Sequence, residues 1–341
     1  MKAEFGIRLP VSGPLASAEP IRKIAQEADA LGFDAICVHD HISVGQNEKY
    51  HFSAGVAESV EANEKKGLPV TNFYEAFNTL AYAAGLTKHV KLGPSALVLP
   101  WRSPALFARQ CATLQELSSG RFVPALCIGR YPGSFEALGL PYLSRGRMFD
   151  ESLELLKLLF TSDKKIDFKG KYFNCQVEPI YPKPKDMPIW IGGGNNQIVY
   201  ERVAKYADGL HGNGTPQEMR KSLDRITEAL VRFGRRGTTI KIGRQTFLCL
   251  AETNEEARRL TEYTLHMFYH AQQFDEIREK MVKETLSSSL IGDAAHVTET
   301  VQRYLDAGLT FSEMRLIGVH TLEEALEMMR LFADRIMSSF Q

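Results

Sequence analysis

The sequence lacks the features that would direct it out of a reducing cytosol. Its five cysteines are odd in number and widely spaced, and they contain no Cys-x-x-Cys pair. Such cysteines inside apolar runs indicate buried thiols rather than disulfides or zinc ligands. There is no basic-then-apolar signal at the N-terminus, and no uncharged apolar run reaches membrane-spanning length. We therefore expect a cytoplasmic protein that does not act at a membrane.

An excess of one charge is also missing, since Lys+Arg and Asp+Glu are 41 each. A nucleic-acid or anionic-membrane partner would favour a basic balance, so we expect neither. The chain also has no Gly-x-Gly-x-x-Gly fingerprint after its first strand-like run, which argues against a nicotinamide-binding fold. Its 341 residues, 44% of them apolar, suffice for two ordinary domains or for one α/β barrel.

What the chain does have is a repeated alternation of strand-like runs with helical patterns. Helix-period apolar spacing separates eight short runs. These runs are residues 5–9, 34–39, 90–99, 121–128, 189–191, 207–211, 241–250 and 313–319. Eight such units predict a (β/α)8 TIM barrel, which we expect to be a single domain over residues 1–341. The main alternative, an open doubly wound sheet with a second domain, would carry its glycine-rich turn after the first strand.

Three insertions interrupt the repeat. Residues 41–71 are long, polar and irregular, and loops of this kind in compact domains are usually functional, so we expect a lid. Residues 130–187 form a second insertion after strand four, with an amphipathic helix over 145–160 and a small hairpin over 166–173. The third is the helical region 255–290, which we expect to be broken near Ala271.

A glycine-rich junction follows the fifth strand, and a helix from Gln197 to Tyr206 begins directly after it. Bare N–H groups at the positive end of a helix suit a phosphate. The alternative is a turn that needs glycine only for tight packing. The candidate cofactor-binding residues here are Gly192, Gly193, Gly194 and Asn195.

The second strand ends in His39-Asp40-His41. The two histidines, at i and i+2, share one face of a strand, as in a metal pair. No third ligand of evident spacing follows, so we predict no metal. A histidine at the strand mouth can act as an acid or base, or stabilise negative charge on a cofactor ring, and it can also be a packed structural residue. We take Asp40 and His41 as candidate catalytic residues, with Asp40 also a candidate cofactor ligand.

Strands three and four supply the remaining candidates. Strand three carries Gly93, Pro94 and Ser95 where a buried strand is expected, and proline removes a ladder donor. This predicts a bulge beside the active site, with Ser95 and Ala96 as cofactor-binding residues. Strand four ends in Gly129 and Arg130, both candidate cofactor contacts, and Arg130 is also a candidate catalytic residue. Arg130 is either a clamp for an anionic substrate or phosphate, or a member of a salt bridge on the rim.

Several longer stretches resemble the luciferase-like monooxygenase superfamily. They are Thr79–Gly93, Leu97–Pro104, Ala112–Phe122, Phe135–Gly139, Pro188–Gly194 and Ala207–Gly209. Within the superfamily the chain is most similar to the bacterial subgroup assigned to the deazaflavin coenzyme F420. The resemblance implies a ring that leans on a strand-three bulge, with a non-prolyl cis peptide at Ser95–Ala96. It also implies a phosphate on the Gly192–Gly194 loop and matches the Asp-His of the deazaflavin members to Asp40 and His41.

The chain departs from the family pattern at strand four. Relatives commonly read Gly-x-Gly-x-Gly followed by Trp, Tyr or Glu, whereas this sequence reads Ala125 to Gly129 and then Arg130. An acid role at that mouth therefore cannot be carried over to this chain. The segment 41–71 is also unlike its counterparts, and we expect it to determine substrate identity.

The leading prediction is an F420-dependent oxidoreductase that transfers a hydride between the deazaflavin ring and a small organic substrate. His41 would stabilise the anionic ring or move the accompanying proton, and Arg130 would clamp a substrate anion. The first alternative is an FMN-dependent monooxygenase that receives electrons from a separate flavin reductase. The second is a catalytically silent cofactor-binding protein of the same fold. The resemblance further implies a homodimer.

Overall fold

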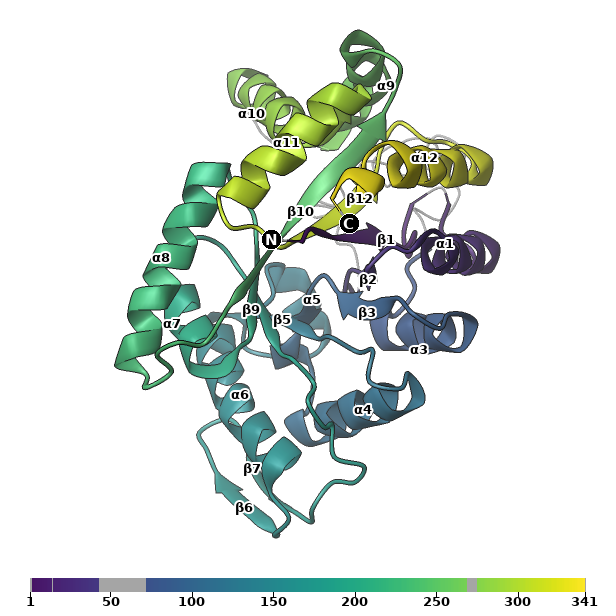
Figure 1. Ribbon diagram of the computed structural model, residues 1–341. Helices are drawn as coiled ribbons and strands as arrows, with labels where there is room; N and C mark the ends of the chain where they lie inside the picture. Colours follow the sequence, from purple (N-terminus) through teal and green to yellow (C-terminus); the bar gives the residue numbers. More distant parts are fainter. Residues whose placement is uncertain (1, 14, 43–71, 269–274, 341) are drawn as a thin grey trace.

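The computed structural model describes residues 2–13, 15–42, 72–268 and 275–340. The predicted lid lies outside the described residues, apart from its first two positions. Parallel strands form one curled sheet, and helices surround it on its outer face (Figure 1). No helix in the described part of the chain is long and apolar enough to cross a membrane.

The sheet closes on itself. Its strand order is β3-β2-β1-β12-β10-β9-β8-β5-β4, and every pairing in it is parallel. Strands β3 and β4 are consecutive segments of the third barrel strand, so the two ends of this order meet. A bridge between Leu92 of β3 and Phe122, just before β5, also joins the third strand to the fourth. The strands are β1 (Glu4–Arg8), β2 (Ala35–Val38), β3 (Lys91–Pro94), β4 (Leu97–Val98), β5 (Ala125–Cys127), β8 (Trp190–Gly192), β9 (Gly209–Gly212), β10 (Lys241–Leu250) and β12 (Phe311–Leu316). The predicted (β/α)8 barrel is confirmed.

The helices follow their sequence signals. Helix α1 buries Ile21, Ile24 and Ala28 at helical spacing and ends at Gly32, whose φ of 80° is a left-handed cap. Helices α8 and α12 both begin with a capping box. The helices that cover the barrel are α1 (Ala18–Leu31), α3 (Ala76–Leu86), α4 (Pro104–Leu117), α6 (Arg145–Thr161), α7 (Gln197–Tyr206), α8 (Pro216–Arg232), α9 (Asn254–Phe268), α10 (Asp275–Ser288), α11 (Ala294–Asp306) and α12 (Leu322–Arg335).

The lower part of the barrel lumen is filled by aromatic rings. Trp190 and Phe311 meet edge to face at 5.8 Å between ring centroids. Glycines make room for them: a Cβ on Gly243 would lie 2.6 Å from the Trp190 ring, and a Cβ on Gly6 would lie 2.6 Å from the Phe311 ring. This apolar plug closes the lumen below, so the polar residues further along the strands form the floor of the barrel mouth.

One boundary prediction needs correction. The second strand of the hairpin in the 130–187 insertion is β7 (Asn174–Val177), which pairs with β6 (Ile166–Lys169), whereas the sequence suggested an end at residue 173. The reason is the turn, because the backbone N–H groups of residues 171–173 all donate to the carboxylate of Glu151 at 2.6–2.9 Å. These residues are therefore not available for strand pairing.

The predicted run of strand three over 90–99 is split into β3 and β4, at the bulge that the sequence predicted. Short elements without a sequence prediction are α5 (Pro132–Ala137) and β11 (Leu290–Gly292). Strand β11 pairs with the second half of β10, on the side that the shorter β9 leaves open.

Candidate active site

The predicted bulge in strand three is present. Strand β3 ends at Pro94, β4 begins at Leu97, and the peptide bond between Ser95 and Ala96 is cis, as the resemblance implied. The N–H of Ser95 donates to the carbonyl of Val38 at 2.7 Å. Ser95 is buried and Ala96 is partly exposed, so the bulge presents a small side chain at the barrel mouth.

Asp40 braces the chain just after the bulge. Its carboxylate accepts hydrogen bonds from the N–H of Val98 at 2.8 Å and from both terminal nitrogens of Arg102 at 2.6 and 2.9 Å. Arg102 also donates to the Val98 carbonyl at 3.1 Å. Burial alone would lower the pKa of Arg102, but the hydrogen bond and charge of Asp40 raise it. Asp40, predicted to touch the cofactor or take part in catalysis, therefore lies where it holds strand β4 in place.

A group of polar side chains supports the bulge from inside the barrel, and of its members only Ser95 was a predicted site residue. We call this group the lumen network: Arg8, Ser95, His211, Gln245, Glu313 and Arg315. Arg8 donates to the hydroxyl of Ser95 and to the carboxylate of Glu313. Gln245 Nε2 lies 2.7 Å from the Ser95 carbonyl oxygen and 2.9 Å from its Oγ. For Gln245, Glu313 and Arg315 the available signal was a polar side chain inside the apolar strands β10 and β12.

Glu313 is the central acid of the lumen network, and its side chain has no exposed surface. Burial by itself would raise the pKa of this carboxyl, but the charges of Arg8, His211 and Arg315 lower the pKa to about 2. His211 Nε2 lies 2.9 Å from the second carboxylate oxygen. Glu313 is therefore ionised and holds Arg8 from the neighbouring strand β12.

Two histidines lie near the same mouth. His39 Nε2 is 2.9 Å from Ser12 Oγ, and the rings of His39 and His41 are 5.1 Å apart. Burial, followed by the charges of Arg315 and Arg8, lowers the pKa of His41 to about 3. Burial also lowers the pKa of His39 well below its ordinary value. Both imidazoles are therefore neutral at pH 7.

The glycines after β8 have different structural reasons. A Cβ on Gly192 would lie 2.9 Å from the Ala96 Cβ, so glycine lets this loop approach the bulge. A Cβ on Gly193 would lie 2.8 Å from the Val199 side chain, which is a packing requirement. Gly194 is exposed, and a Cβ there would have 3.9 Å to its nearest neighbour. Packing explains the first two glycines, and the third lies on an open surface.

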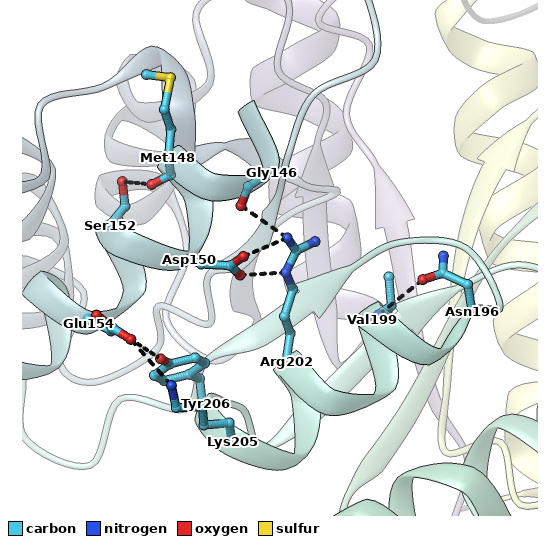
Figure 2. A network of polar contacts seen from close by, with 10 residues as sticks. All are labelled: Gly146, Met148, Asp150, Ser152, Glu154, Asn196, Val199, Arg202, Lys205 and Tyr206. Carbon is cyan, nitrogen blue, oxygen red and sulfur yellow. Dashed lines mark hydrogen bonds and ion pairs between the residues drawn. The ribbon is translucent and has the colours of Figure 1, made fainter. Parts of the chain in front are cut away.

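Helix α7 begins immediately after this loop. Asn196 caps it by accepting from the Val199 N–H at 3.2 Å (Figure 2). The side chain of Asn195 donates to the Asn213 carbonyl at 3.0 Å and accepts from Ser222 Oγ at 3.2 Å. These contacts hold the loop while leaving the first-turn N–H groups of residues 197 and 198 without helical acceptors. Such an exposed helix start suits a phosphate.

Helix α6 of the 130–187 insertion holds α7 through what we call the α6–α7 network (Figure 2). Arg202 makes two hydrogen bonds to Asp150, at 2.6 and 3.0 Å, and a third to the carbonyl of Gly146 at 3.0 Å. Glu154 accepts from Tyr206 and Lys205 at 3.0 and 3.3 Å. The insertion thus sets the position of the helix that carries the candidate phosphate site.

The two residues predicted at the end of strand four, Gly129 and Arg130, have different surroundings. Gly129 has a φ of 80°, and a Cβ there would lie 2.6 Å from Val98, so it is a turn packed against β4. Arg130 is exposed, and its guanidinium lies 5.7 Å from the centroid of the Tyr131 ring. Arg130 makes no ion pair with any of the described residues.

The sequence profile that describes the luciferase-like monooxygenase matches residues 4–311. The chain belongs to the luciferase-like monooxygenase family. It is accordingly an enzyme of the luciferase-like oxidoreductase class.

Among curated luciferase-like relatives, an uncharacterized protein of Mycobacterium tuberculosis is 29% identical over 208 residues, which cover 60% of this chain and 68% of that protein. The FMNH2-dependent dimethylsulfone monooxygenase of Pseudomonas fluorescens is 26% identical over 239 residues, covering 70% of this chain and 59% of the relative.

Two solved structures share the fold. An F420-dependent secondary alcohol dehydrogenase in complex with an F420-acetone adduct has a TM-score of 0.75 at 18% identity, with 98% of each chain covered. The oxygenating constituent of 3,6-diketocamphane monooxygenase from Pseudomonas putida, in complex with FMN, also has a TM-score of 0.75 at 18% identity, with 100% and 99% covered. The fold is thus shared by F420-dependent and FMN-dependent enzymes.

Proposed function

We propose that this enzyme is an F420-dependent oxidoreductase that transfers a hydride between the deazaflavin ring and a small organic substrate. The observation that carries the proposal is the contact between the bulge and the glycine loop, where a Cβ on Gly192 would strike Ala96. It places a small-residue platform directly beside an exposed helix N-terminus. This pairing suits a flat ring joined to a phosphate.

The residues fit such a cofactor in two further respects. Gly194 and the first turn of α7 offer exposed backbone N–H groups with open space beside them. His39 Nδ1 is buried and has no hydrogen-bond partner among the described residues, as expected in a site that a polar ligand completes. When bound, the ring supplies the two-electron chemistry.

The chain's own residues would bind and orient that cofactor. Ser95 and Ala96 form the platform, Gly192, Gly193, Gly194 and Asn195 form the phosphate loop, and Asp40 holds the platform in place through Arg102 and Val98. Gly129 packs against β4 behind the platform. Arg130, exposed at the rim, would clamp an anionic group of the substrate.

His41 would act near the ring as a neutral imidazole. A pKa of about 3 makes it a weak proton acceptor and leaves it one N–H to donate. Because Arg8 and Arg315 contribute to this low pKa, an anionic ring that offsets their charge would raise it. His41 would then stabilise the anion or hold the proton that accompanies the hydride.

A second candidate function is an FMN-dependent monooxygenase, which the match to a dimethylsulfone monooxygenase favours. It would require a separate flavin reductase as a partner. We further propose a cytoplasmic homodimer whose subunit is one domain over residues 1–341, with the lid 41–71 and the insertion 130–187.

The test is a fluorescence titration of the purified protein with F420 and, separately, with FMN. Tight F420 binding with little FMN binding is the expected result. A preference for FMN would overturn the proposed function in favour of the FMN-dependent monooxygenase. Gly194→Asp should weaken binding through charge repulsion with the phosphate, whereas the matched Gly194→Asn adds nearly the same shape without charge. The same substitution at Gly193 would be less informative, because its Cβ would clash with Val199.

A further inference from the structure

The orientation of the Gln245 side-chain amide is determined by its neighbours. On one side, 2.7 Å away, lies the carbonyl oxygen of Ser95, which can only accept. On the other, 2.8 Å away, lies a terminal nitrogen of Arg315, which can only donate. The nitrogen of the amide must therefore face Ser95 and its oxygen must face Arg315.

The same reasoning decides the polarity of the Ser95 hydroxyl. Its oxygen receives one hydrogen bond from Gln245 Nε2 at 2.9 Å and another from Arg8. A guanidinium and an amide NH2 are donors without acceptor capacity, and a hydroxyl has two lone pairs and one proton. Both lone pairs of Ser95 are thus occupied, so its own proton points away from Arg8 and from Gln245.

Both donors are themselves held in place. The Arg8 guanidinium, with a side chain 6% exposed, is held by the fully buried Glu313. Gln245 is held by Arg315, and it also donates to the Ser95 carbonyl. The hydroxyl cannot reverse its direction unless one of these buried donors moves and loses an acceptor, which is costly in a dry lumen.

We propose that Ser95 is a one-directional hydrogen-bond donor to an acceptor atom of the bound cofactor ring, and that Arg8 and Gln245 are positioning residues that set its direction. The proposal rests on the proposed function, which places the ring on the bulge. Ser95 is 6% exposed, and below it the lumen is closed by Trp190 and Phe311. A donor of fixed direction at this floor favours the ring in its reduced, more electron-rich state.

The test measures the dissociation constants of the oxidised and reduced cofactor separately, under anaerobic conditions, by fluorescence and absorbance titration. Ser95→Ala should weaken binding of the reduced form by about five- to tenfold and that of the oxidised form less, because the lost donor serves the reduced ring most. Gln245→Met should cause part of the same loss. In the double variant the two losses should not add, since Gln245 acts through the Ser95 hydroxyl.

Ser152→Ala is the matched control. Ser152 is also a fully buried serine, but its hydroxyl donates to the Met148 carbonyl within α6, outside the lumen network (Figure 2). It should leave both dissociation constants unchanged. Thermal unfolding of each variant identifies any that fail to fold, and Gln245→Met, which keeps the hydroxyl, carries the test if Ser95→Ala is unstable.

The outcomes separate the two proposals. If the unaltered protein binds neither F420 nor FMN, the proposed function fails. If it binds one of them and Ser95→Ala changes neither constant, or changes both by the same factor, then the directional donor is wrong and the proposed function stands. Losses that add in the double variant would show that Gln245 does not act through Ser95.

Discussion

The lumen network and the α6–α7 network both support the candidate site with acids paired to cations, but they differ in their contact with water. In the lumen network the side chains of Glu313 and Arg8 are 0% and 6% exposed. In the α6–α7 network the side chains of Asp150 and Glu154 are 45% and 52% exposed. Charges that water cannot reach interact far more strongly than charges it can screen.

This difference separates two kinds of support. A buried pair such as Arg8–Glu313 gains little net stability over apolar packing, yet removing one partner leaves the other charge stranded. A half-exposed pair such as Lys205–Glu154 can be lost with little consequence, because water replaces the partner. The bulge that we propose as a platform should therefore be rigid, and helix α7 at the proposed phosphate site should tolerate change.

Glu313→Gln should have the largest effect on stability. It strands the Arg8 guanidinium in the lumen, and we expect a loss of about 3–5 kcal/mol in the free energy of unfolding. Urea unfolding at neutral pH measures it. The control is Glu4→Gln, at the other end of the barrel, where Lys241 and Lys91 lie 2.7 and 3.1 Å from a partly exposed carboxylate. Equal losses in both variants would contradict the comparison.

Asp40→Asn should come next, with a loss of about 2–3 kcal/mol and weaker cofactor binding, because the amide breaks two charge-assisted bonds to Arg102. Glu75→Gln is a matched control: Glu75 also approaches Arg102, at 3.5 Å, but its side chain is 47% exposed. It should change stability little. Unfolding curves together with the cofactor titration check both, and unchanged stability in Asp40→Asn would show that the brace is unimportant.

Acidic pH should lower the stability of the folded protein through His41. Its pKa is about 3 in the folded protein and near 6.5 when unfolded, so between these values the unfolded state binds more protons. Stability is therefore unaffected above about pH 6.5 and falls as the pH drops toward 3. His41→Gln should make this fall shallower, as urea midpoints at several pH values would show. An identical pH dependence in the variant would mean that other groups cause the fall.

The smallest effects belong to the α6–α7 network. Asp150→Asn should cost about 0.5–1 kcal/mol, because Arg202 makes two bonds to it but the carboxylate is half exposed. Glu154→Gln should fall within the error of the measurement. Thermal unfolding of the two variants in parallel tests the order, and a cost for Asp150→Asn as large as that of Glu313→Gln would break the comparison between the networks.

Local signals explain which predictions agree with the structure. The predicted bounds of α7 and β10 coincide with those observed, because a glycine turn, an asparagine cap and an apolar run lie next to each other in the chain. The break in strand three followed from Pro94 for the same reason. The contact between Asp40 and Arg102 could not be predicted from local signals, since Arg102 lies 62 positions further along the chain.

By itself the sequence determined the barrel, the order of its units, the bulge and the glycine loop, since periodicity, caps and turn residues act between near neighbours in the chain. The tertiary structure alone decided what each polar residue does. Arg8 and Glu313 are separated by 305 positions and Ser95 and Gln245 by 150, and they meet only because the sheet closes. Closure also excludes water from the lumen, and this exclusion makes their charges and hydrogen-bond directions matter.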